Sequence, residues 1–163
     1  MKLKPDFETL YDTYYDKIYH YAYSILLNRE NAEDVVSDTF FAAYAAYSRY
    51  DPNTASPATW LTRIAHNKAV DFVKSPAYRK TEQMDESFDA VSPDDMTGQA
   101  EKNDLILHLY ARLTKAEREF LNLRYVMELT DAEIAALYDL PVKTINKRYQ
   151  RLLTRCRGLL DEE

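Results

Sequence analysis

Apolar residues recur every three or four positions in several segments of this 163-residue chain. In residues 7–27 the recurring residues are Leu10, Tyr14, Ile18, Tyr21 and Ile25. This is the 3.6-residue period of a helix that buries one face, so the pattern predicts an amphipathic helix over this segment.

Two further helices are predicted in the N-terminal half. One covers residues 32–47, after a polar break at residues 28–31 that supplies cap residues. The other covers residues 57–74, with Ser56 as its N-cap and Pro57 at the first helical position. The first 76 residues therefore read as one small helical domain.

The chain changes character in residues 77–101, which are acidic and poor in large aliphatic side chains. Such a segment is typical of a linker. Helical periodicity then returns, and the pairs Thr114/Glu117 and Thr130/Glu133 have the spacing of capping boxes, which mark helix starts. Four more helices are predicted, over Lys102–Leu113, Lys115–Val126, Asp131–Leu137 and Pro141–Leu160.

Composition supports an all-α fold. The chain contains 2 glycines and 6 prolines, too few for the many turns of a β-sandwich or barrel. The predicted architecture is two small helical domains, residues 1–76 and 102–163, joined by an acidic linker at residues 77–101.

The single cysteine, Cys156, excludes a disulfide framework and a thiolate zinc site.

No metal or cofactor is expected, because the three histidines are widely scattered and no glycine-rich phosphate loop is present. The chain has no apolar run of about 18 residues, as a membrane-spanning helix requires, and its first residues lead into no apolar leader segment. These features favour a cytoplasmic protein.

The net charge is −6, which taken alone argues against nucleic acid as a partner. The distribution of charge changes that conclusion. Residues 60–80 contain five cations and one anion, and residues 143–157 contain six cations and no anion. Between them, residues 82–104 contain eight anions and one cation. Two basic stripes are therefore separated by an acidic tether.

The segment from Asp131 to Leu153 has the spacing of a helix-turn-helix. Ala135 stands where the two helices cross closely, and Ile145 stands where the second helix faces inward. Asp139 stands in the turn, where glycine is preferred, but aspartate tolerates the left-handed conformation at modest cost.

The second helix of this motif projects polar and basic side chains that could read base edges and grip phosphates in a major groove. They are Lys143, Thr144, Asn146, Lys147, Arg148 and Arg151. The alternative interpretation is a basic, solvated helix on a helical bundle.

In the N-terminal half, four polar side chains share one row of the predicted helix at residues 57–74: Arg63, Asn67, Asp71 and Lys74. With Trp60 nearby, this row suits single-stranded DNA, whose bases stack on aromatic rings. The alternative is that Trp60 simply belongs to the core.

Glu30, Asp34 and Asp38 form an acidic row with a spacing of four residues. This row is either a docking face for a basic partner helix or a solvated charged face. A catalytic role is not supported, because no nucleophile, metal cluster or phosphate loop accompanies the carboxylates, so the chain is not expected to be an enzyme.

The motifs and their order resemble those of the bacterial extracytoplasmic-function (ECF) sigma factors, a two-domain branch of the sigma-70 family. Residues 31–40 resemble the family's region 2 signature, and residues 51–52, 59–67 and 71 resemble its promoter-melting part. Residues 113–124 and 130–153 resemble region 4. The resemblance covers residues 7–160.

The resemblance implies a sigma factor that directs RNA polymerase to promoters and helps to open them, with core polymerase and promoter DNA as partners and an anti-sigma factor as a further candidate. It implies that Glu33, Asp34, Val36, Asp38 and Phe41 dock on the clamp helices of core polymerase. It assigns the melted −10 element to Asn53, Trp60, Arg63, Asn67, Lys68, Asp71 and Lys74. It assigns the −35 element to the six residues from Lys143 to Arg151 named above.

The chain departs from the family pattern at four positions. Ser37 stands in place of a usual glutamine and His66 in place of a common arginine, which affects the details of contacts. Asp139 and Lys143 replace two usual glycines, which affects how the −35 element is read.

Two other functions remain open from the residues alone. The chain could be a stand-alone helix-turn-helix regulator whose N-terminal helices dimerise or sense a ligand. It could also be an adaptor in which the basic stripe is incidental. Only the sigma-factor interpretation requires core polymerase for specific binding to DNA.

Overall fold

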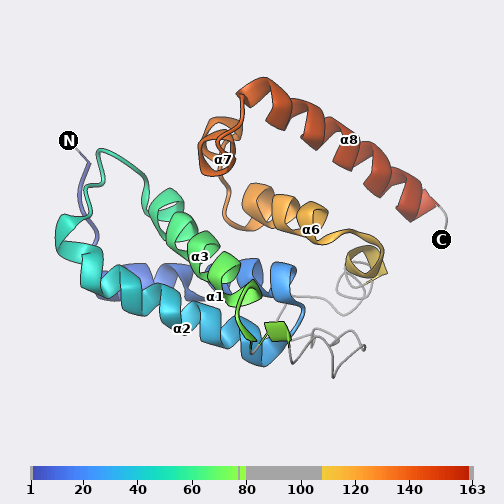
Figure 1. The fold of residues 1–163 in the computed structure, drawn as a ribbon. Helices are drawn as coiled ribbons and strands as arrows, with labels where there is room; N and C mark the ends of the chain where they lie inside the picture. Colours follow the sequence, from blue (N-terminus) through green and yellow to red (C-terminus); the bar gives the residue numbers. More distant parts are fainter. Residues whose placement is uncertain (1, 77, 80–107, 162–163) are drawn as a thin grey trace.

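The computed structural model of the chain describes residues 2–76, 78–79 and 108–161, and every regular element in that part is helical. The N-terminal unit consists of α1 (Phe7–Leu26), α2 (Arg29–Ala46), a short 3₁₀ turn η1 (Tyr47–Arg49) and α3 (Pro57–Val73). The C-terminal unit consists of α6 (Lys115–Leu121), the turn η2 (Asn122–Val126), α7 (Asp131–Tyr138) and α8 (Val142–Asp161), and residues 108–112 are also helical. The expected all-α fold with two helical units is confirmed (Figure 1).

The predicted acidic linker at residues 77–101 lies outside the described residues, apart from Tyr78 and Arg79. The same is true of the first part of the helix predicted over Lys102–Leu113. In the part of the chain that the structure covers, we find no helix with the length and apolar character needed to cross a membrane.

The helices of the N-terminal unit begin at side-chain caps. Asn28 accepts a hydrogen bond from the amide of Asn31 at 2.9 Å, and Ser56 accepts one from the amide of Thr59 at 3.2 Å. Helix α2 starts three residues earlier than its pattern predicts, because only two residues separate it from α1: Leu27, which is left-handed (φ 50°), and Asn28, which is extended. Both predicted capping boxes of the C-terminal unit, at the starts of α6 and α7, are present.

The helix predicted over Lys115–Val126 is helical throughout but changes type at Asn122. There α6 widens into a single π-helical turn, in which the amide of Met127 donates to the carbonyl of Asn122 at 2.9 Å. The side-chain amide of Asn122 is buried and donates to the Tyr110 hydroxyl at 2.8 Å. Periodicity cannot distinguish such a turn from an ordinary α-helix, because it inserts only one residue.

The helix-turn-helix has the predicted turn. Asp139 adopts the left-handed conformation (φ 55°, ψ 49°), and the amide of Leu140 donates to the carbonyl of Ala135 at 2.9 Å. Ala135 and Ile145 are buried where α7 and α8 cross. The small core of this motif therefore forms as its spacing predicts.

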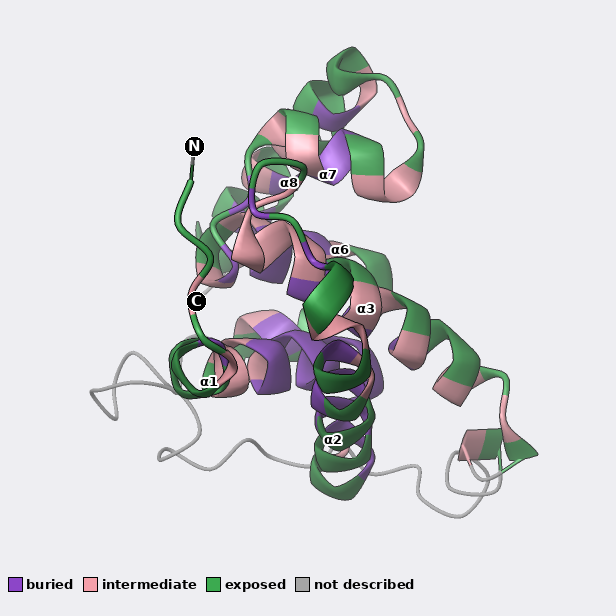
Figure 2. Ribbon diagram, turned by 90° about the vertical axis from the view of Figure 1, so that its left-hand side faces the viewer, coloured by how far each residue is buried: buried purple, intermediate pink, exposed green. Residues whose placement is uncertain are grey.

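One continuous apolar core runs through both units. In the N-terminal unit it is built by stripes along α1, α2 and α3, and Figure 2 shows the exposed positions of α2 on the side away from the other two helices. In Figure 1, α6 lies between this three-helix layer and α8. Fully buried members of the core include Ile18, Val36, Leu61, Leu123 and Ile145.

One expectation about a surface residue is wrong. Val36 is expected on the face that docks on polymerase, but its side chain is 0% exposed. The helical period explains this, because Ala32, Val36, Phe40 and Ala43 form the buried stripe of α2. Val36 therefore packs in the core, on the inner side of α2, and does not belong to the exposed face.

Replacing Asp139 by glycine is expected to raise the free energy of unfolding by about 0.5–1 kcal/mol. Glycine adopts the left-handed conformation without the Cβ penalty and removes a negative charge at the C-terminal end of α7. Chemical denaturation measures the change. Asp139→Ala is the matched control and should be less stable than the glycine variant, since it keeps the Cβ; the opposite order would contradict the argument.

Val36→Ala is expected to lower the free energy of unfolding by about 1–3 kcal/mol, because it opens a cavity in a closely packed core. Phe41→Ala, five residues further along α2, should change it by less than about 0.5 kcal/mol, because Phe41 is 81% exposed. Equal effects of the two substitutions on thermal or urea unfolding would refute this division of α2 into inner and outer faces.

Candidate nucleic-acid and partner surfaces

Helix α8 has one buried side and one open side. Ile145, Leu152 and Cys156 are buried against the rest of the C-terminal unit. On the opposite side the exposed side chains form what we call the outward row of α8: Lys143, Asn146, Lys147, Gln150 and Thr154. Three of them are predicted −35 residues. Gln150 was missed by sequence reasoning, although it stands one helical turn after Asn146.

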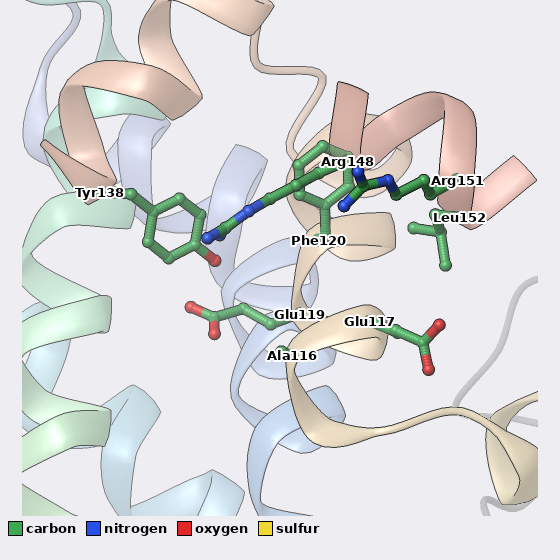
Figure 3. A pocket seen from close by; sticks show the side chains of 8 residues that line it. All are labelled: Ala116, Glu117, Glu119, Phe120, Tyr138, Arg148, Arg151 and Leu152. Atoms are coloured by element: carbon green, nitrogen blue, oxygen red, sulfur yellow. The ribbon is translucent and has the colours of Figure 1, made fainter. Parts of the chain in front are cut away.

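Arg148 and Arg151 are exposed but point elsewhere. They line a pocket of about 380 Å³ between α6, α7 and α8, here called the α6–α8 pocket. Figure 3 shows Arg148 extending toward the ring of Tyr138, with Glu119 of α6 below it, whereas Glu117 points away from both arginines. The six predicted −35 residues are therefore divided between two sides of α8, and Thr144 is half-buried at its start.

The carboxylates in the α6–α8 pocket already have hydrogen-bond donors. Glu119 accepts from the Tyr21 hydroxyl at 2.7 Å and lies 3.1 Å from Nδ1 of His66. Glu117 lies 2.9 Å from Nε of Arg155. Within the described residues no ion pair joins Arg148 or Arg151 to a carboxylate, so both guanidinium groups remain available to an anion.

The predicted row on α3 is exposed. Arg63, Asn67, Asp71 and Lys74 follow one another along the surface of the helix, and Lys68 is half-buried beside them. A row of mixed cations and amides on one rigid helix can follow a nucleic-acid backbone and still contact bases.

Trp60 is half-buried and stacks on Tyr50, with ring centroids 4.2 Å apart and an angle of 13° between the rings. Tyr50 is buried and donates its hydroxyl to the carbonyl of Ala55 at 2.9 Å. Burial, together with Tyr14 and Asp51 nearby, raises the pKa of Tyr50 to about 12, so it remains a neutral donor. One face of the indole is thus occupied, and the stack attaches the loop at residues 51–56 to α3.

Asn53 lies at the exposed tip of that loop. Its backbone amide donates to the carboxylate of Asp51 at 2.9 Å, and its side-chain oxygen accepts from the backbone amide of Lys2 at 3.0 Å. The first bond forms a local Asx-type turn, and the second joins the loop to the N-terminal segment.

The outer face of α2 combines acidic and aromatic side chains. Glu33, Asp34 and Asp38 are exposed along it, and Phe41 follows one turn later. Tyr44, 71% exposed, extends the aromatic end and was missed by sequence reasoning, although a spacing of three residues from Phe41 places it on the same face. Such an apolar patch beside charged residues is typical of a protein-binding surface.

No cluster of three or more histidine, cysteine, aspartate or glutamate residues in the described part of the chain could hold a metal ion. The predicted site residues in this part of the chain form three exposed surfaces. The surface on α2 is acidic and aromatic, the one on α3 is mixed, and the one on α8 is basic.

Comparison with known proteins identifies both halves of the chain. The model of sigma-70 region 2 matches residues 10–79, and a model of sigma-70 region 4 matches residues 103–156. The ECF RNA polymerase sigma factor SigW of Bacillus subtilis is 31% identical over 157 residues, covering 89% of this chain and 83% of SigW. BldN of Streptomyces coelicolor is also 31% identical, covering 91% of this chain and 59% of BldN.

Two solved structures have a similar fold. CnrH in complex with the cytosolic domain of CnrY matches with a TM-score of 0.66 at 25% identity, covering 96% of this chain and 88% of CnrH. The sigma factor RpoE in complex with the anti-sigma factor NepR, from Bartonella quintana, matches with a TM-score of 0.75 at 24% identity, covering 96% and 97%. With both regions matched in order and SigW aligned along most of its length, the chain belongs to the ECF group of the sigma-70 family and is an RNA polymerase sigma factor that acts in transcription initiation.

Proposed function

We propose that the three exposed surfaces divide promoter recognition and opening between them. Residues 1–76 bind core polymerase and the −10 element, residues 102–163 bind the −35 element, and residues 77–101 tether the two. The observation that carries this proposal is the separation of an acidic, aromatic face on α2 from the mixed polar face on α3 and the basic face on α8.

The outer face of α2 is the proposed polymerase site. Glu33, Asp34 and Asp38 favour a basic partner helix and steer its approach, as complementary charges do at protein interfaces. Phe41, with Tyr44 beside it, provides the large apolar anchor on which binding energy tends to concentrate. The clamp helices of core polymerase are the proposed partner.

The −10 element is assigned to α3 and to the loop before it. The residues proposed to act there are Asn53, Trp60, Arg63, Asn67, Lys68, Asp71 and Lys74. A non-template base that leaves the stack needs an aromatic surface and a polar pocket, and the backbone on either side needs cations. The Trp60–Tyr50 stack supports this role, because it holds the indole in a fixed orientation next to the loop.

The −35 element is assigned to α8. The early residues Lys143, Thr144, Asn146 and Lys147 would enter the major groove, and we add Gln150 because it extends the same outward row. Arg148 and Arg151 flank that row and are assigned to phosphates, which their available guanidinium groups suit.

We further propose that the protein catalyses no reaction itself and acts in the cytoplasm, with nucleotide addition performed by polymerase. An anti-sigma factor is a proposed partner. This is supported by the two solved relatives, one bound to the cytosolic domain of CnrY and the other to NepR.

Purified protein with core polymerase is expected to give run-off transcripts from a subset of genomic fragments, and neither component alone should do so.

Phe41→Ala should weaken binding to core polymerase roughly tenfold, as loss of an aromatic anchor does. Leu3→Ala removes an apolar side chain that is 94% exposed outside α2 and serves as the control. Tight binding to a palindromic duplex without polymerase, and no run-off product, would indicate a stand-alone regulator.

Gln150→Ala is expected to relax the preference at one base pair of the −35 element, costing about 1–3 kcal/mol there, because a glutamine amide can pair with a base edge. Lys147→Ala should weaken binding evenly across DNA sequences. It should also reduce the slope of the logarithm of the binding constant against the logarithm of the salt concentration by about one. Thr154→Ala, one turn further along the outward row, is the control. Promoter libraries bound by the holoenzyme measure all three, and an unchanged preference in Gln150→Ala would remove this residue from the reading set.

A further inference from the structure

The segment before α1 is held against a distant part of the chain. Residues 2–5, here called the N-terminal strap, run beside the loop at residues 51–56 and the turn η1 that precedes it (Figure 1). The backbone amide of Lys2 donates to Oδ1 of Asn53 at 3.0 Å, although the two residues are 51 positions apart in the sequence. The strap thus contacts the tip of the loop that we assign to the −10 element.

Tyr47 of η1 anchors the strap. Its hydroxyl donates to the carbonyl of Pro5 at 2.6 Å, and its own carbonyl accepts from the ammonium group of Lys4 at 2.6 Å. The same ammonium group lies 4.1 Å from the centroid of the Tyr47 ring, which packs edge-on against Phe7 at the start of α1. Because a charged donor makes a stronger hydrogen bond than a neutral one, this anchor can hold a strap whose residues 2–4 are exposed.

The strap and the loop together determine the orientation of the Asn53 carboxamide. Its Oδ1 accepts from the N–H of Lys2, and its Nδ2 donates to the carboxylate of Asp51 at 3.2 Å. A backbone N–H can only donate and a carboxylate accepts, so these two partners determine which way round the amide group lies. Its oxygen keeps one acceptor site and its nitrogen keeps one N–H for a further partner.

The donor and the acceptor that remain suit the edge of an unpaired base. A base that has left the stack is read by hydrogen bonds to its Watson–Crick edge, and a carboxamide can donate to a base and accept from it at the same time. An asparagine that rotated freely at a loop tip would lose this freedom when the base binds, which reduces affinity. In this protein the strap has already ordered the side chain.

We propose that the N-terminal strap positions Asn53 to read one extruded base of the −10 element. Lys2 acts through its backbone amide, and Lys4 and Tyr47 act by holding the strap, so all three are positioning residues. This inference rests on the proposed function, because the loop belongs to the proposed −10 surface. A broken strap should therefore cause a defect at one base position and leave the −35 element and the binding of core polymerase unaffected.

The test compares two substitutions at residue 2. Lys2→Pro removes the backbone N–H, whereas Lys2→Ala keeps it and removes the charged side chain. Both are made in the full-length protein with a short peptide tag before Met1, so that residue 2 carries an ordinary peptide nitrogen. The holoenzymes are then bound to promoter fragments with an unpaired −10 region, in which each non-template base is varied in turn.

Lys2→Pro should reduce the preference between bases at one −10 position roughly fivefold, as expected when one ordered hydrogen-bonding group is lost. Lys2→Ala should leave the preference unchanged. Asn53→Ala should reduce the preference at the same position. Adding Lys2→Pro to Asn53→Ala should cause no further loss, because the strap acts through that side chain.

A second variant loosens the strap from its other end. Tyr47→Phe deletes the hydrogen bond to Pro5 but keeps the ring, and it should reduce the preference at the same −10 position roughly twofold. Tyr11→Phe is the matched control, because it makes the same substitution at a tyrosine of α1 whose ring packs on Tyr15 and Phe40. It should leave the preference unchanged.

The proposal is overturned if Lys2→Pro and Lys2→Ala behave alike, or if Lys2→Pro still reduces the preference in the Asn53→Ala background. If the wild-type holoenzyme prefers no base at any −10 position, the proposed function fails as well. If the wild type discriminates between bases and neither Lys2→Pro nor Tyr47→Phe alters this discrimination, only the role of the strap is refuted.

Discussion

The carboxylate of Glu119 lies where α1, α3 and α6 meet, and only 13% of its side chain is exposed. Withdrawing a carboxylate from water is costly unless donors replace the lost hydration. The Tyr21 hydroxyl provides one donor, and the His66 ring provides a second polar contact. Because both belong to the N-terminal unit, this carboxylate helps to fix where the C-terminal unit lies, together with Arg118 and the apolar core that the two units share. The direction in which α8 presents Lys147 to solvent follows from that placement.

Local rules account for most of the helices. Apolar periodicity predicted α1, α2, α3 and α8 to within a few residues, and the Thr–x–x–Glu signature predicted the starts of α6 and α7. Aspartate in the turn at position 139 was also predictable, because its short polar side chain tolerates the left-handed region. All of these depend on residues within one or two helical turns of each other, which is the range that a sequence pattern can report.

Features that depend on contacts between distant segments were not predictable in the same way. Arg148 and Arg151 belong to the same cationic run as Lys147, but the position of α6 determines that they line a pocket. The bond between Glu133 and Thr59 spans 74 residues, and nothing in either local pattern predicts it.

The π-helical turn at Asn122–Val126 has a consequence for how this chain can vary. One extra residue in a turn rotates everything after it by about 100° around the helix axis, because an α-helix has 3.6 residues per turn. The π-helical turn therefore determines the direction, around the axis of α6, in which the chain leaves toward the helix-turn-helix. Deleting a single residue there would restore a regular helix and simultaneously re-aim α7 and α8, whereas the same deletion in an exposed loop would leave their orientation intact.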